Sequence, residues 1–336
     1  MLNVYKVGDS RELLQEVESG SVDLIYIDPP YCTGRDFYHF NDKFNSSKDY
    51  RELLIKPMIT ECHRILSDVG NIVVHVEPKI SHHIRIVLDE IFGEKKFKNE
   101  IVWVSGGNHK SLKQLQRHHD TIIVYQKGST SIYNSEHKDY DDETISKAKM
   151  CKFRKQKYNT SALVNRQPNV VSRPNLRYEW NGNFLQWYIS KERMKMLHDD
   201  NRLEYSPNTG IPRVKKYFHE MDGVPVKDVW SDIKQIQGVE KLDYATQKPV
   251  ALLNRIVKMF SNEDSTVLDP CSGSGTLGRS AIVTGRNYIL FDINDEGKKI
   301  FEESLTKIPV EELSQEIQTP LTKLLQSVSY THLTLP

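Results

Sequence analysis

Short apolar runs of strand length recur at both ends of the chain and are scarce in its middle. They cover residues 22–27, 71–76, 100–104, 121–125, 266–268 and 287–291. Apolar runs of this length that are bounded by polar or turn-forming residues are typical of buried strands. We therefore expect six strands, four before the middle region and two after it.

Helical periodicity separates several of these runs. Apolar residues recur three and four positions apart in residues 50–66 and 80–92, and Pro249 precedes a third such stretch at residues 251–260. Proline suits the first turn of a helix because an N–H would have no partner there. Strands that alternate with helices predict a doubly wound α/β sheet.

The alternation stops after about Lys127 and resumes near Gln247, so we expect a separate region between two halves of the sheet. Residues 144–178 lack Asp and Glu but contain nine basic residues: Lys147, Lys149, Lys152, Arg154, Lys155, Lys157, Arg166, Arg173 and Arg177. Aromatic residues lie among or just after them, namely Phe153, Tyr158, Tyr178, Trp180 and Trp187. Such a run can pair with phosphates and stack on bases, which predicts DNA binding. The alternative is a solvated, partly flexible loop.

The overall composition narrows the class of protein without indicating its partner. The 336 residues include 46 Lys and Arg and 45 Asp and Glu, so net charge does not point to a polyanion. No run of about 18 apolar residues and no basic, apolar leader occurs, and we expect a soluble cytoplasmic protein without a membrane partner. The four cysteines form no Cys-x-x-Cys pair and the adjacent histidines lack i,i+4 spacing, so we expect reduced thiols and no metal.

A glycine-rich segment follows the strand expected at residues 266–268 and reads Asp269-Pro270-Cys271-Ser272-Gly273-Ser274-Gly275-Thr276. Residues 273–278, ending in Gly278, match the pattern G-x-G-x-x-G, and Asp292 follows the next expected strand, so a nicotinamide-dependent oxidoreductase fits. A dinucleotide fold, however, passes almost directly from strand to first glycine, whereas four residues intervene here. A carboxylate at this point suits a cation such as S-adenosylmethionine, with Asp292 on its ribose and glycines beside its amino-acid end. A tight turn between strand and helix is a third alternative.

The segment Asp28-Pro29-Pro30-Tyr31 follows the strand at residues 22–27, so we expect it at the carboxyl edge of the sheet, where ligands bind. A carboxylate and a backbone carbonyl can accept both hydrogens of an exocyclic base amine and localise its lone pair. Proline offers such a carbonyl with a fixed φ and no competing N–H, and Tyr31 can stack on the base. The target nucleotide must be flipped out of the duplex to reach this site. Without further support, a proline-rich turn explains the segment equally well.

Two weaker motifs accompany these segments. Gly8-Asp9-Ser10 lies ahead of the first strand, and Thr246-Gln247-Lys248-Pro249 opens the helix before the glycine loop. Lys248 could meet the carboxylate of the methyl donor, whereas Asp9 and Thr246 could simply cap helices. The polar loop Asn108-His109-Lys110-Ser111 is a further candidate wall of the cleft.

In this order, the motifs resemble those of the β-class DNA amino-methyltransferases, in which the Asp-Pro-Pro-Tyr motif comes first and the methyl-donor motif last. Tyr31-Cys32-Thr33-Gly34 is similar to the Tyr-Asn-Thr-Gly of type III modification subunits, with Cys32 in place of Asn, and residues 177–182, 190–194 and 223–233 resemble landmarks of the same subgroup. The resemblance implies a Rossmann-like class I methyltransferase sheet, mostly parallel with one antiparallel edge strand, circularly permuted and carrying an inserted target-recognition region.

The resemblance also implies methyl transfer from S-adenosylmethionine to the N6 amine of adenine in double-stranded DNA. The catalytic residues would be Asp28, Pro29, Pro30 and Tyr31, and the cofactor would contact Asp9, Gln247, Lys248, Asp269, Gly273, Gly275, Thr276 and Asp292. We expect direct displacement, because Pro270-Cys271 resembles a cytosine-carbon methyltransferase nucleophile but lies inside the glycine loop. N4-cytosine methylation and an inactive DNA-binding protein of this fold are alternatives. Expected partners besides DNA are a restriction subunit or a second copy of the chain.

Four segments follow from these motifs. We expect a catalytic half with the base-binding motif at residues 1–130, a target-recognition insert at 131–225 and the methyl-donor half of the same domain at 226–327. Residues 328–336 resemble a one-frame translation of a sequencing-library adapter, so we expect a non-native tail.

Overall fold

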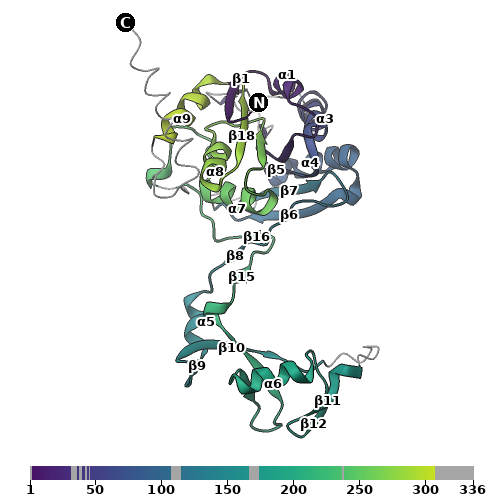
Figure 1. Ribbon diagram of the computed structural model, residues 1–336. Helices are drawn as coiled ribbons and strands as arrows, with labels where there is room; N and C mark the ends of the chain where they lie inside the picture. Colours follow the sequence, from purple (N-terminus) through teal and green to yellow (C-terminus); the bar gives the residue numbers. More distant parts are fainter. Residues whose placement is uncertain are drawn as a thin grey trace. The chain divides into compact units, whose positions relative to one another are not determined.

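The computed structural model describes residues 2–31, 36–37, 40–41, 44, 46–106, 115–165, 174–236 and 238–306. The chain divides into two units, one made of Met1–Glu136 and Lys227–Pro336 and the other of His137–Val226. The first unit is thus assembled from both ends of the chain, which the colours of Figure 1 make visible. The sequence predicts the insert at residues 131–225, and its role in target recognition stays a prediction. The expected tail lies outside the described residues.

Eight strands form the central sheet of the first unit (Figure 1). In spatial order they are β1 (Val4–Val7), β18 (Asn287–Asp292), β17 (Thr266–Asp269), β2 (Val22–Ile27), β5 (Leu66–Val76), β7 (Asp120–Gln126), β6 (Phe97–Trp103) and β16 (Val229–Trp230). Neighbouring strands are parallel except where β7 meets β5 and β6. Strand β2 from the N-terminal half therefore lies beside β17 from the C-terminal half, as a circularly permuted chain requires.

Strand β7 is the reversed strand of this sheet, and it lies inside the sheet. A mostly parallel α/β sheet with one reversed strand is confirmed, but the predicted edge position is wrong. Strand β6 pairs with the outer side of β7, and β16 adds Trp230 beside Trp103. Both tryptophans are buried, so this extension removes apolar surface from water. A strand of two residues has no alternation that a sequence pattern could reveal.

The helices of the first unit pack in two groups. α3 (Lys56–Ile65) contacts α1 (Ser10–Leu13) and α4 (Pro78–Phe92), and α8 (Thr276–Thr284) contacts α7 (Val250–Phe260) and α9 (Asp295–Leu305). Helix α7 buries six apolar side chains, Leu252, Leu253, Ile256, Val257, Met259 and Phe260. Each such burial is worth about 1.5–3 kcal/mol, so the apolar face of α7 contributes strongly to the stability of this unit. Among the described helices, none combines the length and the apolar character needed to cross a bilayer.

The helix expected at residues 50–66 is interrupted. It consists of α2 (Ser47–Tyr50), a π-helical segment at Arg51–Ile55, and α3. Pro57 lies in the first turn of α3 and has no N–H to bond back along the helix, which explains why the regular pattern begins afresh at Lys56. The other short elements of this unit are β3 (Asp36–Phe37), β4 (Phe40–Asn41) and the 3₁₀ turns Leu14–Glu16, Glu94–Lys96 and Gly238–Glu240.

The second unit has a four-stranded antiparallel sheet in the order β13-β14-β10-β9. Its elements are β8 (His137–Lys138), α5 (Asp142–Lys147), β9 (Lys149–Cys151), β10 (Gln156–Ala162), the 3₁₀ turn Pro174–Leu176, β11 (Arg177–Trp180), β12 (Asn183–Gln186), α6 (Lys191–Asp199), β13 (Leu203–Tyr205), β14 (Pro212–Tyr217), the 3₁₀ turn Phe218–Glu220 and β15 (Val224–Pro225). Its buried apolar residues form two small clusters, one around Trp187 and Met194 and one of Cys151, Tyr158 and Tyr217. The core of this unit is therefore divided.

Candidate active site

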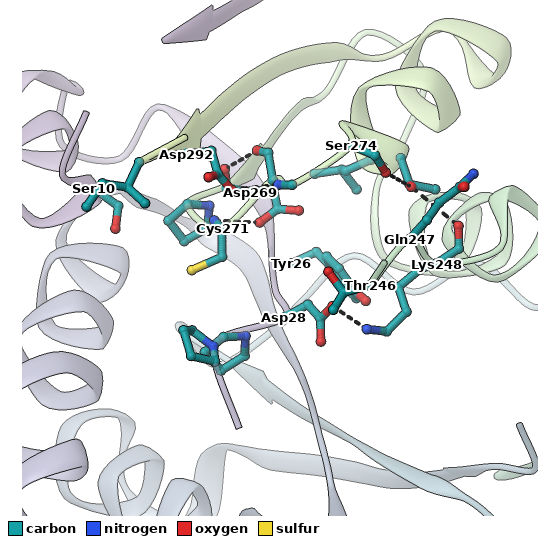
Figure 2. A pocket seen from close by; sticks show the side chains of 18 of the residues that line it. Ser10, Tyr26, Asp28, Thr246, Gln247, Lys248, Asp269, Cys271, Ser274 and Asp292 are labelled. Carbon is teal, nitrogen blue, oxygen red and sulfur yellow. Dashed lines mark hydrogen bonds and ion pairs between the residues drawn. The ribbon is translucent and has the colours of Figure 1, made fainter. Parts of the chain in front are cut away.

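The two predicted motifs meet at neighbouring strand ends. Strands β2 and β17 are parallel and adjacent, with Leu24 opposite Val267 and Ile25 opposite Leu268. Asp28 leaves the end of β2, and Asp269 is the last residue of β17, so segments from opposite ends of the sequence share one edge. A cavity of about 320 Å³ opens there (Figure 2).

Eleven of the twelve predicted catalytic and cofactor residues line this cavity: Asp9, Asp28, Pro29, Pro30, Tyr31, Gln247, Lys248, Asp269, Gly273, Thr276 and Asp292. The twelfth, Gly275, is buried within the glycine loop and does not line the cavity. Sequence reasoning missed an apolar and aromatic part of the wall formed by Tyr26, Phe44, Leu54, Tyr244 and Leu253. These residues carry no motif, because any buried strand or helix contains similar side chains.

Both carboxylate oxygens of Asp28 have partners. The Tyr31 hydroxyl donates to Oδ1 at 2.5 Å. The Lys248 ammonium pairs with Oδ2, as the dashed line in Figure 2 shows. Burial raises the pKa of Tyr31 well above its usual range and the Asp28 charge adds to this, so the phenol keeps its proton and donates it. Lys248 also lies 5.5 Å from the centroid of the Tyr31 ring. These contacts hold Asp28 and Tyr31 in one geometry at the cavity wall.

The glycine loop approaches its neighbours so closely that side chains are excluded. Gly275 has a φ of +72°, and a Cβ there would lie 2.4 Å from Cδ2 of Phe301. Gly273 has a φ of +49°, and its N–H donates to Asp292 Oδ2 at 2.7 Å while its carbonyl accepts from the Tyr5 hydroxyl at 2.6 Å. The loop backbone is therefore fixed at the cavity edge, directly before α8 begins at Thr276.

Asp269 is a buried carboxyl group that forms no ion pair with any of the described residues. Asp269 is 3% exposed, and its Oδ1 accepts a hydrogen bond from the Cys271 N–H at 2.8 Å. Burial raises the pKa of Asp269 well above its usual range, and the charges of Asp28 and Asp292 raise it further. A cation bound in the cavity would offset this cost, so the site favours a positively charged ligand.

Three other predicted cofactor residues also have structural roles. Asp9 caps α1 by accepting from the Arg11 N–H at 2.9 Å, as the capping alternative predicts, and it lines the cavity as well. The Gln247 amide accepts from Leu242 N at 2.7 Å and donates to Glu240 O at 3.0 Å. Lys248, expected at the donor carboxylate, pairs with Asp28 instead. These contacts shape the wall that the sequence assigns to the donor.

A buried polar network below the cavity was not predicted. The Tyr26 hydroxyl lies 2.8 Å from His75 Nδ1, and His75 Nε2 lies 3.4 Å from Asp120 Oδ2. The three residues belong to β2, β5 and β7, and His75 is fully buried. The only signal in the sequence is a histidine inside an apolar strand.

The basic run of the second unit is less available than predicted. Lys147, Lys149 and Arg154 form ion pairs with Glu143, Glu204 and Asp200. Lys157 donates to the Ile145 carbonyl, and Arg177 lies 5.5 Å from the Phe184 ring centroid. Lys152 and Lys155 are exposed and have no ion pair with any described residue. Arg166, Arg173, the loop at residues 108–111 and Cys32 lie outside the described residues.

Comparison with known proteins identifies relatives across most of the chain. The type II methyltransferase M.EcaI of Enterobacter cloacae is 28% identical over 82% of this chain and 63% of its own length. The type III StyLTI Mod subunit of Salmonella typhimurium is 25% identical over 87% of the chain and 52% of its own length. The DNA adenine methyltransferase YhdJ of Escherichia coli is 26% identical over 86% and 78%. The chain thus spans less than two thirds of the first two relatives.

The fold has a counterpart among solved structures. The cytosine-N4-specific PvuII DNA methyltransferase superposes with a TM-score of 0.53 at 14% identity, covering 97% of this chain and 93% of that one. This likeness supports the Rossmann-like fold. The profile of the family described as DNA methylase, covering N6 and N4 methyltransferases, matches residues 22–303. The match extends from β2 into α9, and it confirms the family that the motifs resemble. The chain belongs to the DNA methylase family of N6 and N4 methyltransferases.

Proposed function

We propose that this chain is a site-specific DNA methyltransferase that transfers a methyl group from S-adenosylmethionine to the N6 amine of adenine. The observation that carries the proposal is the meeting of Asp28-Pro29-Pro30-Tyr31 and the glycine loop in one cavity. Family membership favours a methyl donor over the nicotinamide alternative. Adenine is favoured over cytosine by the Asp of the first motif and by the name of the YhdJ relative.

The residues of the cavity suit this donor. Gly273 and Gly275 allow the loop backbone to approach it, Asp292 offers oxygens to its ribose, and the buried Asp269 favours its positive charge. When bound, the donor supplies an electrophilic methyl group on a sulfonium sulfur, which becomes a neutral thioether. Both its charge and its need for close backbone contact are thus met by groups already in place.

On the base side, Asp28 and the Pro29 carbonyl accept the two hydrogens of the exocyclic amine, and Tyr31 stacks on the ring. The nitrogen lone pair then forms the new N–CH₃ bond in a direct displacement, and one amine proton leaves afterwards. Positioning of this kind contributes up to about 7–11 kcal/mol in favourable cases. Burial raises the pKa of the Cys271 thiol well above its usual range, so no thiolate is available for a covalent intermediate.

We expect the ion pair between Lys248 and Asp28 to open during this reaction. With Tyr31 on Oδ1 and Lys248 on Oδ2, each carboxylate oxygen already has one partner before a base arrives, and the amine competes with Lys248 for Oδ2. The side chains of Lys248 and Asp28 are 14% and 16% exposed, so the incoming amine replaces a well-shielded partner. Lys248 is then free to meet the donor carboxylate.

The second unit is proposed to select the DNA sequence. Its exposed Lys152 and Lys155 suit phosphates, and its hairpins suit a groove. The StyLTI relative is named as a Mod subunit of a restriction-modification enzyme, so a restriction subunit is a proposed partner, with a second copy of this chain as the alternative.

The direct test is transfer of labelled methyl groups from S-adenosylmethionine to unmodified genomic DNA by the purified chain, followed by analysis of the nucleosides. We expect N6-methyladenine, near-complete loss of transfer in Asp28→Ala, and retained transfer in the control Cys271→Ser. Tyr31→Ala should weaken base capture while sparing donor binding. Detection of N4-methylcytosine would show that cytosine, and not adenine, is the target base. Full activity of Asp28→Ala would contradict the proposed mechanism. Sequencing the product DNA then gives the recognition site.

A further inference from the structure

The hairpin between β9 and β10 carries the most exposed aromatic ring of the basic segment. Of the five aromatic residues singled out in the sequence, Tyr158, Tyr178 and Trp187 are buried at 7%, 9% and 1% exposure, whereas Phe153 is 74% exposed. The fifth, Trp180, is half-buried and packs against the cluster around Trp187. Few of the aromatic side chains that the sequence predicts to stack on bases are therefore exposed enough to do so. Phe153 remains available for stacking, while the three buried rings build the cores of the unit.

Exposure of one phenylalanine is common and is not evidence of a binding site by itself. The position of Phe153 in the hairpin provides further evidence. Residues 152–155 form the loop of the hairpin, closed by the Lys155 N–H donating to the Cys151 carbonyl at 2.7 Å. Lys155 adopts a φ of +52°, which turns the chain sharply. Phe153 thus lies in the tight loop that joins the two strands.

The base of the same hairpin is held firmly. Cys151 is buried and its Sγ accepts from the Tyr217 hydroxyl at 3.3 Å. The Tyr158 hydroxyl donates to Glu204 at 2.7 Å, and from the loop itself Arg154 lies 5.4 Å from the Tyr217 ring centroid and pairs with Asp200. A loop on such a base keeps its direction when its ring is pressed against a ligand, so little order has to be gained on binding.

The basic residues of the hairpin differ in whether they have an acidic partner. Asp200 and Glu204, which contact the hairpin, pair with Arg154 and Lys149. Lys152 and Lys155 flank the exposed ring and form no ion pair with the described part of the chain. An apolar ring between two free cations matches a stack of bases between two phosphate strands, because the cations meet phosphates while the ring meets bases.

We propose that Phe153 inserts against the bases of duplex DNA, with Lys152 and Lys155 on the flanking phosphates. The inference rests on the proposed function, since it assumes that duplex DNA is the substrate. In this proposal, one hairpin loop both deforms the duplex by unstacking bases and contributes to the affinity for DNA. Arg154 and Lys149 pair with acidic residues of the unit and Lys147 pairs with Glu143 on a solvated surface, so none of the three belongs to this contact.

The test uses the full chain and a fluorescent duplex that contains the mapped methylation site, with 2-aminopurine placed at successive positions. We expect Phe153→Ala to weaken binding about tenfold and to abolish the 2-aminopurine signal of unstacking at one base step. Phe153→Leu, which keeps an apolar side chain, should retain part of both. Phe184→Ala is the matched control, because Phe184 is 61% exposed in the same unit but lies beside Arg177.

A salt titration separates the ring from the cations. Lys152→Gln with Lys155→Gln should reduce the slope of log K against log salt by about 2, whereas Phe153→Ala should leave the slope unchanged. An unchanged melting temperature shows that Phe153→Ala still folds. Wild-type affinity and wild-type unstacking in Phe153→Ala would overturn this inference alone. Absence of methyl transfer by the wild-type chain on the same duplex would instead overturn the proposed function.

Discussion

Lys248 and Asp28 in the first unit are 14% and 16% exposed, whereas Lys147 and Glu143 in the second unit are 73% and 75% exposed. Both are ion pairs, but their surroundings differ. The first pair borders a cavity lined by residues of both sequence motifs, and the second is a side-chain pair one helical turn apart on a solvated surface. Polar residues at strand ends of the first unit therefore indicate a site, while basic residues of the second unit indicate one only where they remain unpaired.

The largest effect of a substitution is expected in the glycine loop of the first unit, where close packing should make the chain least tolerant of change. Gly275→Ala combines a strained φ with a contact on Phe301, and we expect a loss of about 3 kcal/mol in the free energy of unfolding and much weaker donor binding. Gly20→Ala is the matched control, because Gly20 has the same φ of +72° with no atom within 4 Å of the added Cβ. Urea unfolding measures the free energy of unfolding of the two variants, and calorimetry measures their donor binding. Equal losses would mean that backbone strain, and not packing against Phe301, restricts the loop.

The buried network below the cavity should follow next. His75→Phe leaves the Tyr26 hydroxyl and Asp120 without their neighbour, and we expect a loss of about 2 kcal/mol in the free energy of unfolding. Because Tyr26→Phe removes the other partner, the double variant should lose clearly less than the sum of the two single losses. Strictly additive losses in urea unfolding would contradict a coupled pair.

A pH titration of donor binding tests the charge of the cavity. Burial, then the nearby carboxylates, raises the pKa of Asp269, so the empty site favours the protonated acid and a cation favours the ionised one. Donor affinity should fall as the pH falls through this raised pKa, by about tenfold per pH unit. Without the donor, the raised pKa has the opposite effect on stability. The free energy of unfolding should fall as the pH rises from the pKa of Asp269 in the unfolded chain to its higher pKa in the folded protein. Calorimetry on Asp269→Asn should give weak, pH-independent binding.

The smallest effect is expected on the surface of the second unit. Lys147→Ala should change neither the melting temperature nor the salt dependence of DNA binding, because its exposed pair with Glu143 is screened by solvent. Arg154→Ala should lower the melting temperature, since Arg154 also packs over Tyr217. A clear drop in DNA affinity for Lys147→Ala would break the comparison and restore the basic run as a continuous DNA-binding surface.

Much of the first unit could be predicted because its elements are long and periodic. The runs at residues 22–27 and 287–291 correspond to β2 and β18, and the stretch at 251–260 corresponds to α7. The interior place of β7 and the addition of β16 could not be predicted, since strand order depends on pairing between distant segments. The break at Arg51–Ile55 was missed because an apolar face continues through it.

The sequence by itself determined the family, the strand–motif–helix order and the chemical types at the cavity, because these depend on residues close together in the chain. The tertiary structure decided which of those residues have partners. Lys248 meets Asp28 across 220 positions, and Gly275 is packed under Phe301. In the second unit it distinguished Phe153 from the buried rings and Lys155 from the paired lysines. Burial and most of these ion pairs arise from contacts between distant segments, so composition alone cannot specify them.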